Sequence, residues 1–359
     1  MTEESSTTAD MSVAMTATGM TQVTSESYMT SSAASRSSYL YFYFQCAVLV
    51  IGVVGTATNA VIIYALVASK QHKKHVLIAN QNVLDLFTSF LLTITYSLRL
   101  CKIHLTGSIG YWLCTLILSE SLCYSGLLGS AINLAIVSVE RYLKIVHRTW
   151  SKKHLRKWMI YSAAAFAWIA SITYMLALVI NTAKVIDGVC YPYYAFWKNQ
   201  TAALAHTIWN FISFYAVILL IFIFCYWRIL VVIRHQASVM AGHSASGGSS
   251  TNQTQFSHIQ ASVIKTMVLV SVLYAISFLP NYVSILLLHL NPDLQLRNTG
   301  YHYASLFISF LYICINPSIY ATKLDPVKEV LLRMIPCKKI SEQATENIAA
   351  ARSGNRPIT

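Results

Sequence analysis

The sequence predicts an all-α membrane protein, a bundle of seven membrane-spanning helices followed by a short amphipathic eighth helix. The 359 residues are 55% hydrophobic and only 11% charged, whereas a soluble globular protein is about 25% charged. The mean hydropathy is +0.53. A helix needs about 20 mostly apolar residues to cross a bilayer, and seven stretches reach that length. They are residues 39–67, 76–100, 111–143, 159–181, 202–227, 262–290 and 301–321.

The first span is not expected to be a cleaved signal peptide, because it begins near residue 39, lacks a basic segment before it and is too long. The second span contains Asp85 near its middle, and the third ends at a pair of charges. The fourth has no charged residue from Met159 onward. The sixth and seventh each contain a proline, which membrane helices tolerate when neighbours satisfy the freed backbone groups.

A short amphipathic helix is predicted after the seventh span. Asp325 suits its N-cap and Pro326 its first helical position. The apolar residues that share one side of this helix are Val327, Val330, Leu331 and Met334. This pattern is typical of a helix that lies in the membrane interface. Cys337 follows it directly and is a candidate for palmitoylation.

Basic residues indicate which loops face the cytoplasm, because Lys and Arg concentrate in cytoplasmic loops. Of the 26 basic residues, 20 fall in one set of loops, at the adjoining helix ends and in the C-terminal tail. That side is predicted to be cytoplasmic, with the N-terminus outside, in a multi-pass protein of the plasma membrane. The net charge of +13 therefore follows from topology and from contact with anionic lipid, and no nucleic-acid partner is expected.

The chain is predicted to consist of a membrane domain, residues 39–336, and two polar ends. Residues 1–38 hold 18 Ser or Thr and are expected to be disordered outside the cell. Residues 337–359 form a cytoplasmic tail, and residues 238–257 a flexible cytoplasmic loop. Asn199 begins an N-Q-T triplet on the outer side, which makes it a candidate N-glycosylation site.

Two charged positions are costly in lipid. Asp85 lies nine residues into the second span, about 14 Å along a helix and close to the bilayer centre. An ionisable group at that depth indicates function. Arg141 ends the third span between Glu140 and Tyr142. Taken alone, Arg141 is explained as an interfacial arginine that extends to water.

The other spans carry single residues that each have an ordinary structural explanation. Trp168 can be a packing residue, Pro280 a tolerated kink, and Asn59 a hydrogen bond between helices. The seventh span ends in N-P-S-I-Y, residues 316–320. What needs explaining is their joint occurrence, in this order, on seven spans.

With these residues in this order on seven spans, the sequence resembles the rhodopsin-like family of G-protein-coupled receptors. The resemblance covers about residues 39–336. The residues that carry it are Asn59, Asp85, Glu140, Arg141, Tyr142, Trp168, Tyr226, Pro280, Asn316, Pro317 and Tyr320. It implies a receptor, and not an enzyme, that binds an extracellular ligand and activates heterotrimeric G proteins. Arrestin and a receptor kinase are the further partners that it implies.

The resemblance also implies roles for the residues of the cytoplasmic side. Arg141 is held by Glu140 at rest and is released on activation. Tyr226 and Tyr320 then move inward to meet Arg141. The sixth helix moves outward about a hinge near Pro280 and opens a cleft for the G protein. The residues implied in this switch are Glu140, Arg141, Tyr142, Tyr226, Asn316, Pro317 and Tyr320.

A polar cavity inside the bundle is implied as well. It contains Asp85, Ser130 and Asn316, with Asn59 beside them, and in this family it holds a sodium ion in the inactive state. Sodium is the only bound cofactor that the resemblance suggests.

The resemblance further implies a disulfide on the outer side. In this family a cysteine at the top of the third helix, here Cys114, pairs with one in the second outer loop, here Cys190. The extracellular side permits such a bond. Cys101 also lies outside, so pairing of Cys101 with Cys190 stays open.

The sequence departs from the family pattern at four places. Two more residues than usual separate Cys114 from Arg141, so the outer third helix is predicted to contain a bulge or a longer loop. Ile218 replaces a proline of the fifth span, and Phe278 replaces a tryptophan of the sixth. Gln260 stands where an acid often pairs with the arginine of the third helix, and measurable ligand-free signalling is therefore expected.

The ligand is not expected to be an amine, because Cys123 stands near the level of the aspartate that binds amines. Retinal is not expected, because residues 301–321 contain no lysine. Glu120 is a candidate counter-ion for a cationic ligand, and the alternative is an ion pair with Arg99. The aromatic outer loop suits a peptide or a mid-sized amphipathic ligand. The residues predicted for the pocket are Arg99, Glu120, Cys123, His206, Trp209, Asn210, Phe278, Tyr301 and His302.

The alternative to a receptor is a multi-span transporter or channel for a small solute. Such proteins often show internal repeats and paired broken helices, and the sequence shows no repeat. A membrane enzyme would need reactive partners for Asp85. The sequence contains no His/Cys set at metal or nucleophile spacing and no Gly-rich phosphate loop.

Overall fold

A computed structural model of the protein describes residues 38–73, 75–192, 200–244, 251–291, 299–323 and 325–334. In chain order, the first helix Ser38–Ala68 is followed by η1 (Gln71–Lys73), α2 (Val76–Leu100), α3 (Gly107–Leu113), η2 (Cys114–Leu118), α4 (Ser121–Val146), α5 (Arg148–His154), α6 (Lys157–Ile180), β1 (Lys184–Ile186), β2 (Val189–Tyr191), α7 (Gln200–Asn210), η3 (Phe211–Ala216), α8 (Val217–Ser244), α9 (Thr251–Leu290), α10 (Gly300–Lys323) and α11 (Asp325–Met334).

Seven helices among these residues are long and apolar enough to cross a membrane, which confirms the predicted fold class. They are Ser38–Ala68, Val76–Leu100, Gly107–Val146, Lys157–Ile180, Gln200–His235, Ile264–Leu290 and Gly300–Ile319. The predicted limits of the second span agree with the structure, and the fifth span extends eight residues beyond its predicted end.

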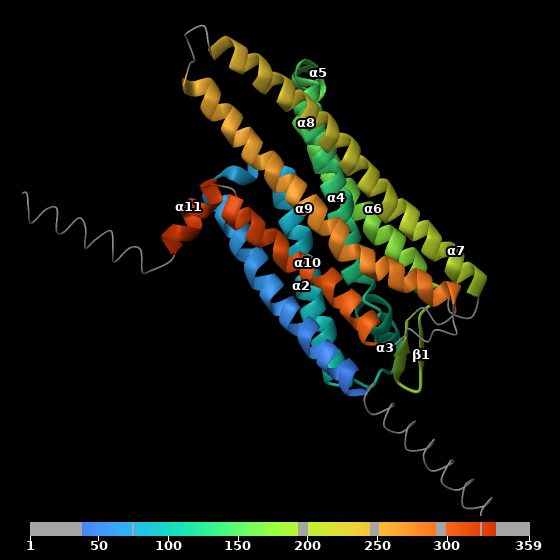
Figure 1. The fold of residues 1–359 in the computed structure, drawn as a ribbon. Helices are drawn as coiled ribbons and strands as arrows, with labels where there is room; N and C mark the ends of the chain where they lie inside the picture. The colour runs from blue at the N-terminus through green and yellow to red at the C-terminus, as the bar shows by residue number, and fades with distance from the viewer. Residues whose placement is uncertain are drawn as a thin grey trace, which may run out of the picture.

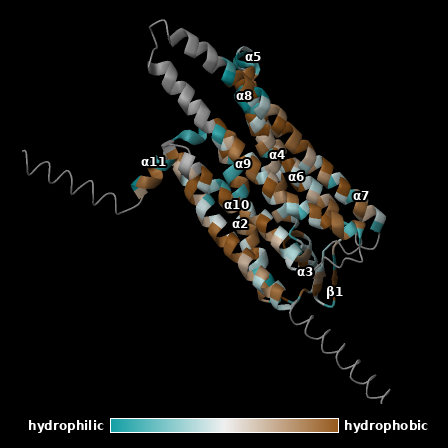
Figure 2. Ribbon diagram, viewed as in Figure 1, coloured by the Kyte–Doolittle hydropathy of each residue, from teal (hydrophilic) through white to brown (hydrophobic). Residues whose placement is uncertain are grey.

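The helices run side by side along one axis (Figure 1). One end of the bundle carries η1, α5 and α11, and we call it the basic end. The opposite end carries the β1–β2 hairpin, and we call it the hairpin end. Hydrophobic residues follow the helices along their length, and hydrophilic segments gather at the two ends (Figure 2). The distribution matches a protein whose middle lies in lipid.

The third span is the centre of the bundle. In its most apolar window 67% of the residues are buried, compared with 22% for the fourth span, α6. α4 packs against α2, α6 and α8. Large apolar residues of the peripheral helices remain exposed for contact with lipid; examples are Phe166, Ile169, Leu220, Ile223 and Trp227.

The first helix and α2 approach each other closely at Gly52. A Cβ atom at this position would lie 2.7 Å from the Oγ1 atom and 2.8 Å from the backbone nitrogen of Thr93. Membrane helices use small residues at such crossings so that their backbones can come close.

We expect the substitution Gly52→Ala to destabilise the protein by about 1–3 kcal/mol, because the added methyl group forces the two helices apart. Thermal unfolding of the purified protein measures this effect. Gly300→Ala is the matched control, because no atom of the described residues lies within 4 Å of the corresponding Cβ position. Equal melting temperatures for both variants would contradict this account of the crossing.

The outer part of the third span contains the predicted bulge. η2 is a turn of π-helix, and it is followed by Glu120 in the left-handed conformation, with φ 60°. A π-turn accommodates extra residues without ending the helix. A second π-turn, η3, lies directly before α8 in the fifth span, although Ile218 stands in place of the usual proline.

A disulfide joins Cys114 at the start of η2 to Cys190 in β2. This decides the alternative that the sequence left open, since Cys101 is free and exposed. β1 and β2 pair antiparallel, and Leu105 N–H donates to Gly188 O at 3.0 Å. The hairpin is thereby held against the third helix.

The predicted flexible loop 238–257 is helical at both ends in the structure, because α8 continues to Ser244 and α9 begins at Thr251. Each residue added to an existing helix gains a backbone hydrogen bond without a new nucleation step. The features expected outside the described residues stay predictions: the N-terminal segment up to residue 37, Asn199, Cys337 and the tail from residue 337.

Candidate functional site

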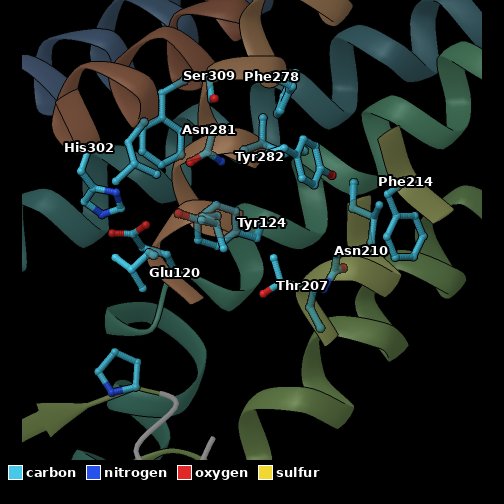
Figure 3. Close-up of a pocket in the computed structure, with 18 of the residues that line it drawn as sticks. Glu120, Tyr124, Thr207, Asn210, Phe214, Phe278, Asn281, Tyr282, His302 and Ser309 are labelled. Atoms are coloured by element: carbon cyan, nitrogen blue, oxygen red, sulfur yellow. The ribbon is translucent and has the colours of Figure 1, made fainter. Parts of the chain in front are cut away.

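A cavity of about 830 Å³ opens between the helices at the hairpin end. Its lining comes from the first helix and from α2, α4, α6, β2, α7, η3, α9 and α10, and it is mostly aromatic and aliphatic. Figure 3 shows polar groups entering this lining from several helices. Six of the predicted pocket residues line the cavity: Arg99, Glu120, His206, Asn210, Phe278 and His302.

Three other predicted pocket residues lie outside the lining. Cys123 is 1% exposed, and its Sγ lies 3.8 Å from the Oγ1 atom of Thr95. Trp209 and Tyr301 are 59% and 46% exposed, on the outer surface of the bundle. In each case a sequence neighbour lines the cavity instead: Tyr124, Asn210 and His302. The predicted level along the helix agrees with the structure, and the rotation about the helix axis does not.

Arg99 and Glu120 form a buried ion pair at the cavity wall. Arg99 Nη1 lies 2.6 Å from Glu120 Oε1, with the side chains 20% and 9% exposed. The Tyr96 hydroxyl donates to the same carboxylate oxygen at 2.9 Å, and Arg99 Nη2 donates to Leu118 O at 2.7 Å. The structure therefore shows the ion-pair alternative for Glu120. A cationic ligand would have to compete with Arg99 for this carboxylate.

The wall opposite Glu120 is polar but formally uncharged. Thr207 and Asn210 come from α7, and Asn281 and Tyr282 come from α9 directly after Pro280 (Figure 3). Asn210 Oδ1 accepts a hydrogen bond of 2.9 Å from the hydroxyl of Tyr174. These side chains offer amide and hydroxyl groups, which suit hydrogen bonding to a neutral polar chain.

The disulfide bears directly on this cavity. Tyr191 and Pro192, next to Cys190, belong to the lining. The covalent link from Cys190 to Cys114 therefore holds part of the loop between α6 and α7 against the mouth of the cavity.

Asp85 is fully buried in the middle of the bundle. Its Oδ1 accepts a hydrogen bond of 2.9 Å from Ser130 Oγ, and its Oδ2 accepts one of 2.8 Å from Asn316 Nδ2. These contacts join α2, α4 and α10. Asn59 Nδ2 instead donates to the backbone oxygens of Gly55 at 2.9 Å and Ile313 at 3.2 Å, and so ties the first helix to α10.

A chain of buried amides continues from Asp85 toward α6. Gln81 contacts Ser130 through its Nε2 atom and accepts from Asn133 Nδ2 at 2.7 Å. Asn80 Nδ2 donates to Asn133 Oδ1 at 2.9 Å, and Trp168 Nε1 donates to Asn80 Oδ1 at 3.0 Å. Gln81 was not predicted from the sequence to belong to this network. Its signal is its place one helical turn before Asp85, on the same side of α2.

Arg141 lies at the basic end, where its side chain is 14% exposed. Its Nε is 3.5 Å from Glu140 Oε2, and its Nη2 is 3.3 Å from His75 Nδ1 at the start of α2. Glu140 Oε1 also forms an ion pair with Lys144. Glu140 is thus shared between two cations, and His75 is a partner of Arg141 that the sequence did not indicate.

The tyrosines of the predicted switch occupy different surroundings. The Tyr226 hydroxyl lies 2.9 Å from Ser138 Oγ and 3.1 Å from Ser271 Oγ, so it bridges α4 and α9. Tyr142 packs against Phe224, at 5.4 Å between ring centroids. Tyr320 belongs to α10, and its side chain lies outside the described part of the chain.

A family model described as "7 transmembrane receptor (rhodopsin family)" matches residues 58–320. The chain belongs to this receptor family. It is therefore a receptor and not an enzyme, and the G-protein-coupled receptor class inferred from the motifs is confirmed. This match favours a receptor over the transporter or channel alternative.

The receptor is similar to C-C chemokine receptor type 8 of Mus musculus, with 25% identity over 301 residues, which cover 80% of this chain and 76% of that protein. Galanin receptor type 1 of Rattus norvegicus is 24% identical over 304 residues, which cover 80% of each chain. A QRFP-like peptide receptor of Branchiostoma floridae is 25% identical over 235 residues, 61% of this chain and 59% of that protein.

Squid rhodopsin has the same fold. Its crystal structure aligns with a TM-score of 0.69 and 15% identity, over 83% of this chain and 86% of that chain. The receptor therefore has a cavity at one end of a rhodopsin-like bundle, an arginine at the other, and a buried carboxylate between them.

Proposed function

We propose that the receptor binds an extracellular peptide in the cavity at the hairpin end and activates heterotrimeric G proteins at the basic end. The observation that carries the proposal is the cavity itself. Its volume of about 830 Å³ lies toward the upper part of the usual range for ligand pockets. Its aromatic lining suits apolar side chains, and its amides and hydroxyls suit a peptide backbone.

The charge of the lining favours a peptide over an amine. Among the described residues of the lining, Glu120 is the only acidic one, and Arg99 already neutralises it at 2.6 Å. A small cation would therefore gain little there. Two of the similar receptors are named for galanin and for a QRFP-like peptide, which agrees with a peptide ligand for this chain.

We place the hairpin end outside the cell and the basic end, with the C-terminal tail, in the cytoplasm. The excess of basic residues at one end supports this orientation. The Cys114–Cys190 disulfide supports it independently, because such bonds persist in oxidising surroundings. Arrestin and a receptor kinase would then share the basic end with the G protein.

The buried polar groups supply a mechanism for coupling the two ends. Asp85 ties α2 to α10 through Asn316, and Tyr226 ties α4 to α9 through Ser138 and Ser271. Such a network is bistable if it can satisfy its groups in a second arrangement of the helices. A ligand that contacts α9 and α10 more favourably in one arrangement shifts the population toward it.

A peptide library applied to cells that report activation of each main G-protein class tests the proposal. We expect a peptide to activate the receptor and Arg141→Ala to abolish the response. Asn281→Ala is expected to weaken potency about fivefold, because a hydrogen bond to a neutral ligand contributes about 1 kcal/mol. Trp209→Ala is the matched control, because Trp209 faces outward. Peptide responses that are equally altered by both variants would contradict binding in this cavity.

Substitution of His75 is expected to raise ligand-free signalling. His75→Ala removes a contact of Arg141 in the arrangement described here. Loss of about 1 kcal/mol from the resting state alone would raise the active population roughly fivefold. His72→Ala is the control, because His72 contacts Leu66 O at 3.4 Å and belongs to η1. A basal signal of His75→Ala no higher than that of the wild type would contradict the role of this contact.

A further inference from the structure

The direction of the hydrogen bonds between Trp168 and Asp85 is determined by chemistry. An indole N–H can only donate, so Asn80 Oδ1 must accept from Trp168 at 3.0 Å. This leaves Asn80 Nδ2 to donate to Asn133 Oδ1 at 2.9 Å. The amide orientation of Asn80 therefore sets that of Asn133.

The same logic continues to Gln81. Asn133 Nδ2 donates to Leu77 O at 2.9 Å and to Gln81 Oε1 at 2.7 Å. With its oxygen held by Asn133, Gln81 must present its NH2 group to Ser130 Oγ, to which it donates.

Asp85 is consequently surrounded by hydrogen-bond donors. Ser130 donates to its Oδ1 at 2.9 Å, and Asn316 Nδ2 donates to its Oδ2 at 2.8 Å. The lone pair of Ser130 Oγ that faces Gln81 is occupied by an amide hydrogen. Every link from Trp168 onward points a hydrogen toward the carboxylate.

This arrangement does not fit a sodium ion. Hard cations bind carboxylate, carbonyl and hydroxyl oxygens, whereas the NH2 group of Gln81 carries partial positive charge. Gln81 is 1% exposed. It cannot turn its oxygen toward Asp85 without breaking its bond to Asn133 and placing two donors against each other.

We propose that the Gln81 amide takes the place of the sodium ion beside Asp85, so that this receptor packs its buried carboxylate against neutral donors and does not depend on sodium. The strongest opposing observation is Asn316 Oδ1, which is buried and has no hydrogen-bond partner among the described residues. That oxygen suits a bridging water, and it is also the oxygen to which a cation would bind.

Thermal unfolding of the purified full-length receptor, in sodium chloride and in choline chloride at equal ionic strength, tests the proposal without ligand or G protein. We expect the wild-type receptor to melt at the same temperature in both salts. Gln81→Leu removes the amide, and it is expected to acquire a sodium-specific increase in melting temperature that saturates, as binding to the folded state requires. Adding Asp85→Asn to that variant should abolish the increase.

A wild-type receptor that is stabilised by sodium in a saturable way would overturn the proposal and favour a cation between Asp85 and Asn316. A wild type and a Gln81→Leu variant that are both insensitive to sodium would overturn the role of Gln81. If Gln81→Leu does not fold, Gln81→Met removes the same amide with an unbranched side chain. Saturable stabilisation of the wild type by sodium would overturn the proposal whichever variant folds.

Discussion

Replacing Glu120 by alanine is expected to destabilise the receptor by about 3 kcal/mol, the low end of the range for breaking a buried ion pair. The substitution leaves the charge of Arg99 without its partner at 2.6 Å and removes the acceptor of the Tyr96 hydroxyl. We expect the low end because Arg99 keeps 20% of its side chain exposed at the cavity. Thermal and denaturant unfolding of the purified receptor measure the loss.

An exposed ion pair serves as the matched control and shows whether the loss of stability depends on burial of the pair. Arg333 and Glu329 in α11 also lie 2.6 Å apart, but their side chains are 77% and 65% exposed. Because exposed pairs contribute little, Arg333→Ala should leave the unfolding temperature unchanged. The double variant Arg99→Met with Glu120→Leu should recover most of the stability, since an apolar pair can replace a buried ion pair. Equal losses from Glu120→Ala and Arg333→Ala would show that burial is not the cause.

Replacing Cys190 by serine is the second substitution with a large expected effect, about 2–5 kcal/mol. The bond closes a loop between residues 76 positions apart, so its removal frees a long segment of the unfolded chain. In the folded state it also frees Tyr191 and Pro192 at the cavity mouth. We expect a lower melting temperature, less receptor at the cell surface and weaker ligand binding.

Cys101→Ser serves as the control, because Cys101 is a free and exposed cysteine on the same side of the bundle. This variant should match the wild type in surface expression and in melting temperature. If Cys101→Ser were as damaging as Cys190→Ser, then Cys101 would be the disulfide partner, and our account of the hairpin would be wrong.

The seven membrane spans could be predicted because they depend on local properties of the chain. Span length and apolar composition are read along one dimension, and the lipid requires the backbone of each span to satisfy itself. The bulge near Glu120 was also detectable, because two extra residues in a helix of known ends must be accommodated somewhere. The level of Asp85 in the bilayer followed from counting residues.

The hydrogen-bond partners of the buried polar groups were harder to predict from the sequence. Asp85 was expected near Ser130 and Asn316, and the structure joins them. Gln81 was not expected there, although it lies one turn from Asp85 on α2. Residues on one helical side share neighbours, but which neighbour each contacts depends on how α2 and α4 pack.

The sequence by itself determined the seven spans, the depth of each functional residue and the family to which the chain belongs. Only the tertiary structure decided which side of each helix faces the cavity. The three misplaced pocket residues, Cys123, Trp209 and Tyr301, are each next to a lining residue, and one residue along a helix is a rotation of about 100°. That rotation is set by packing against neighbouring helices, and in the third and fifth spans the π-turns η2 and η3 also affect it. The apolar pattern of a single helix therefore cannot reveal it.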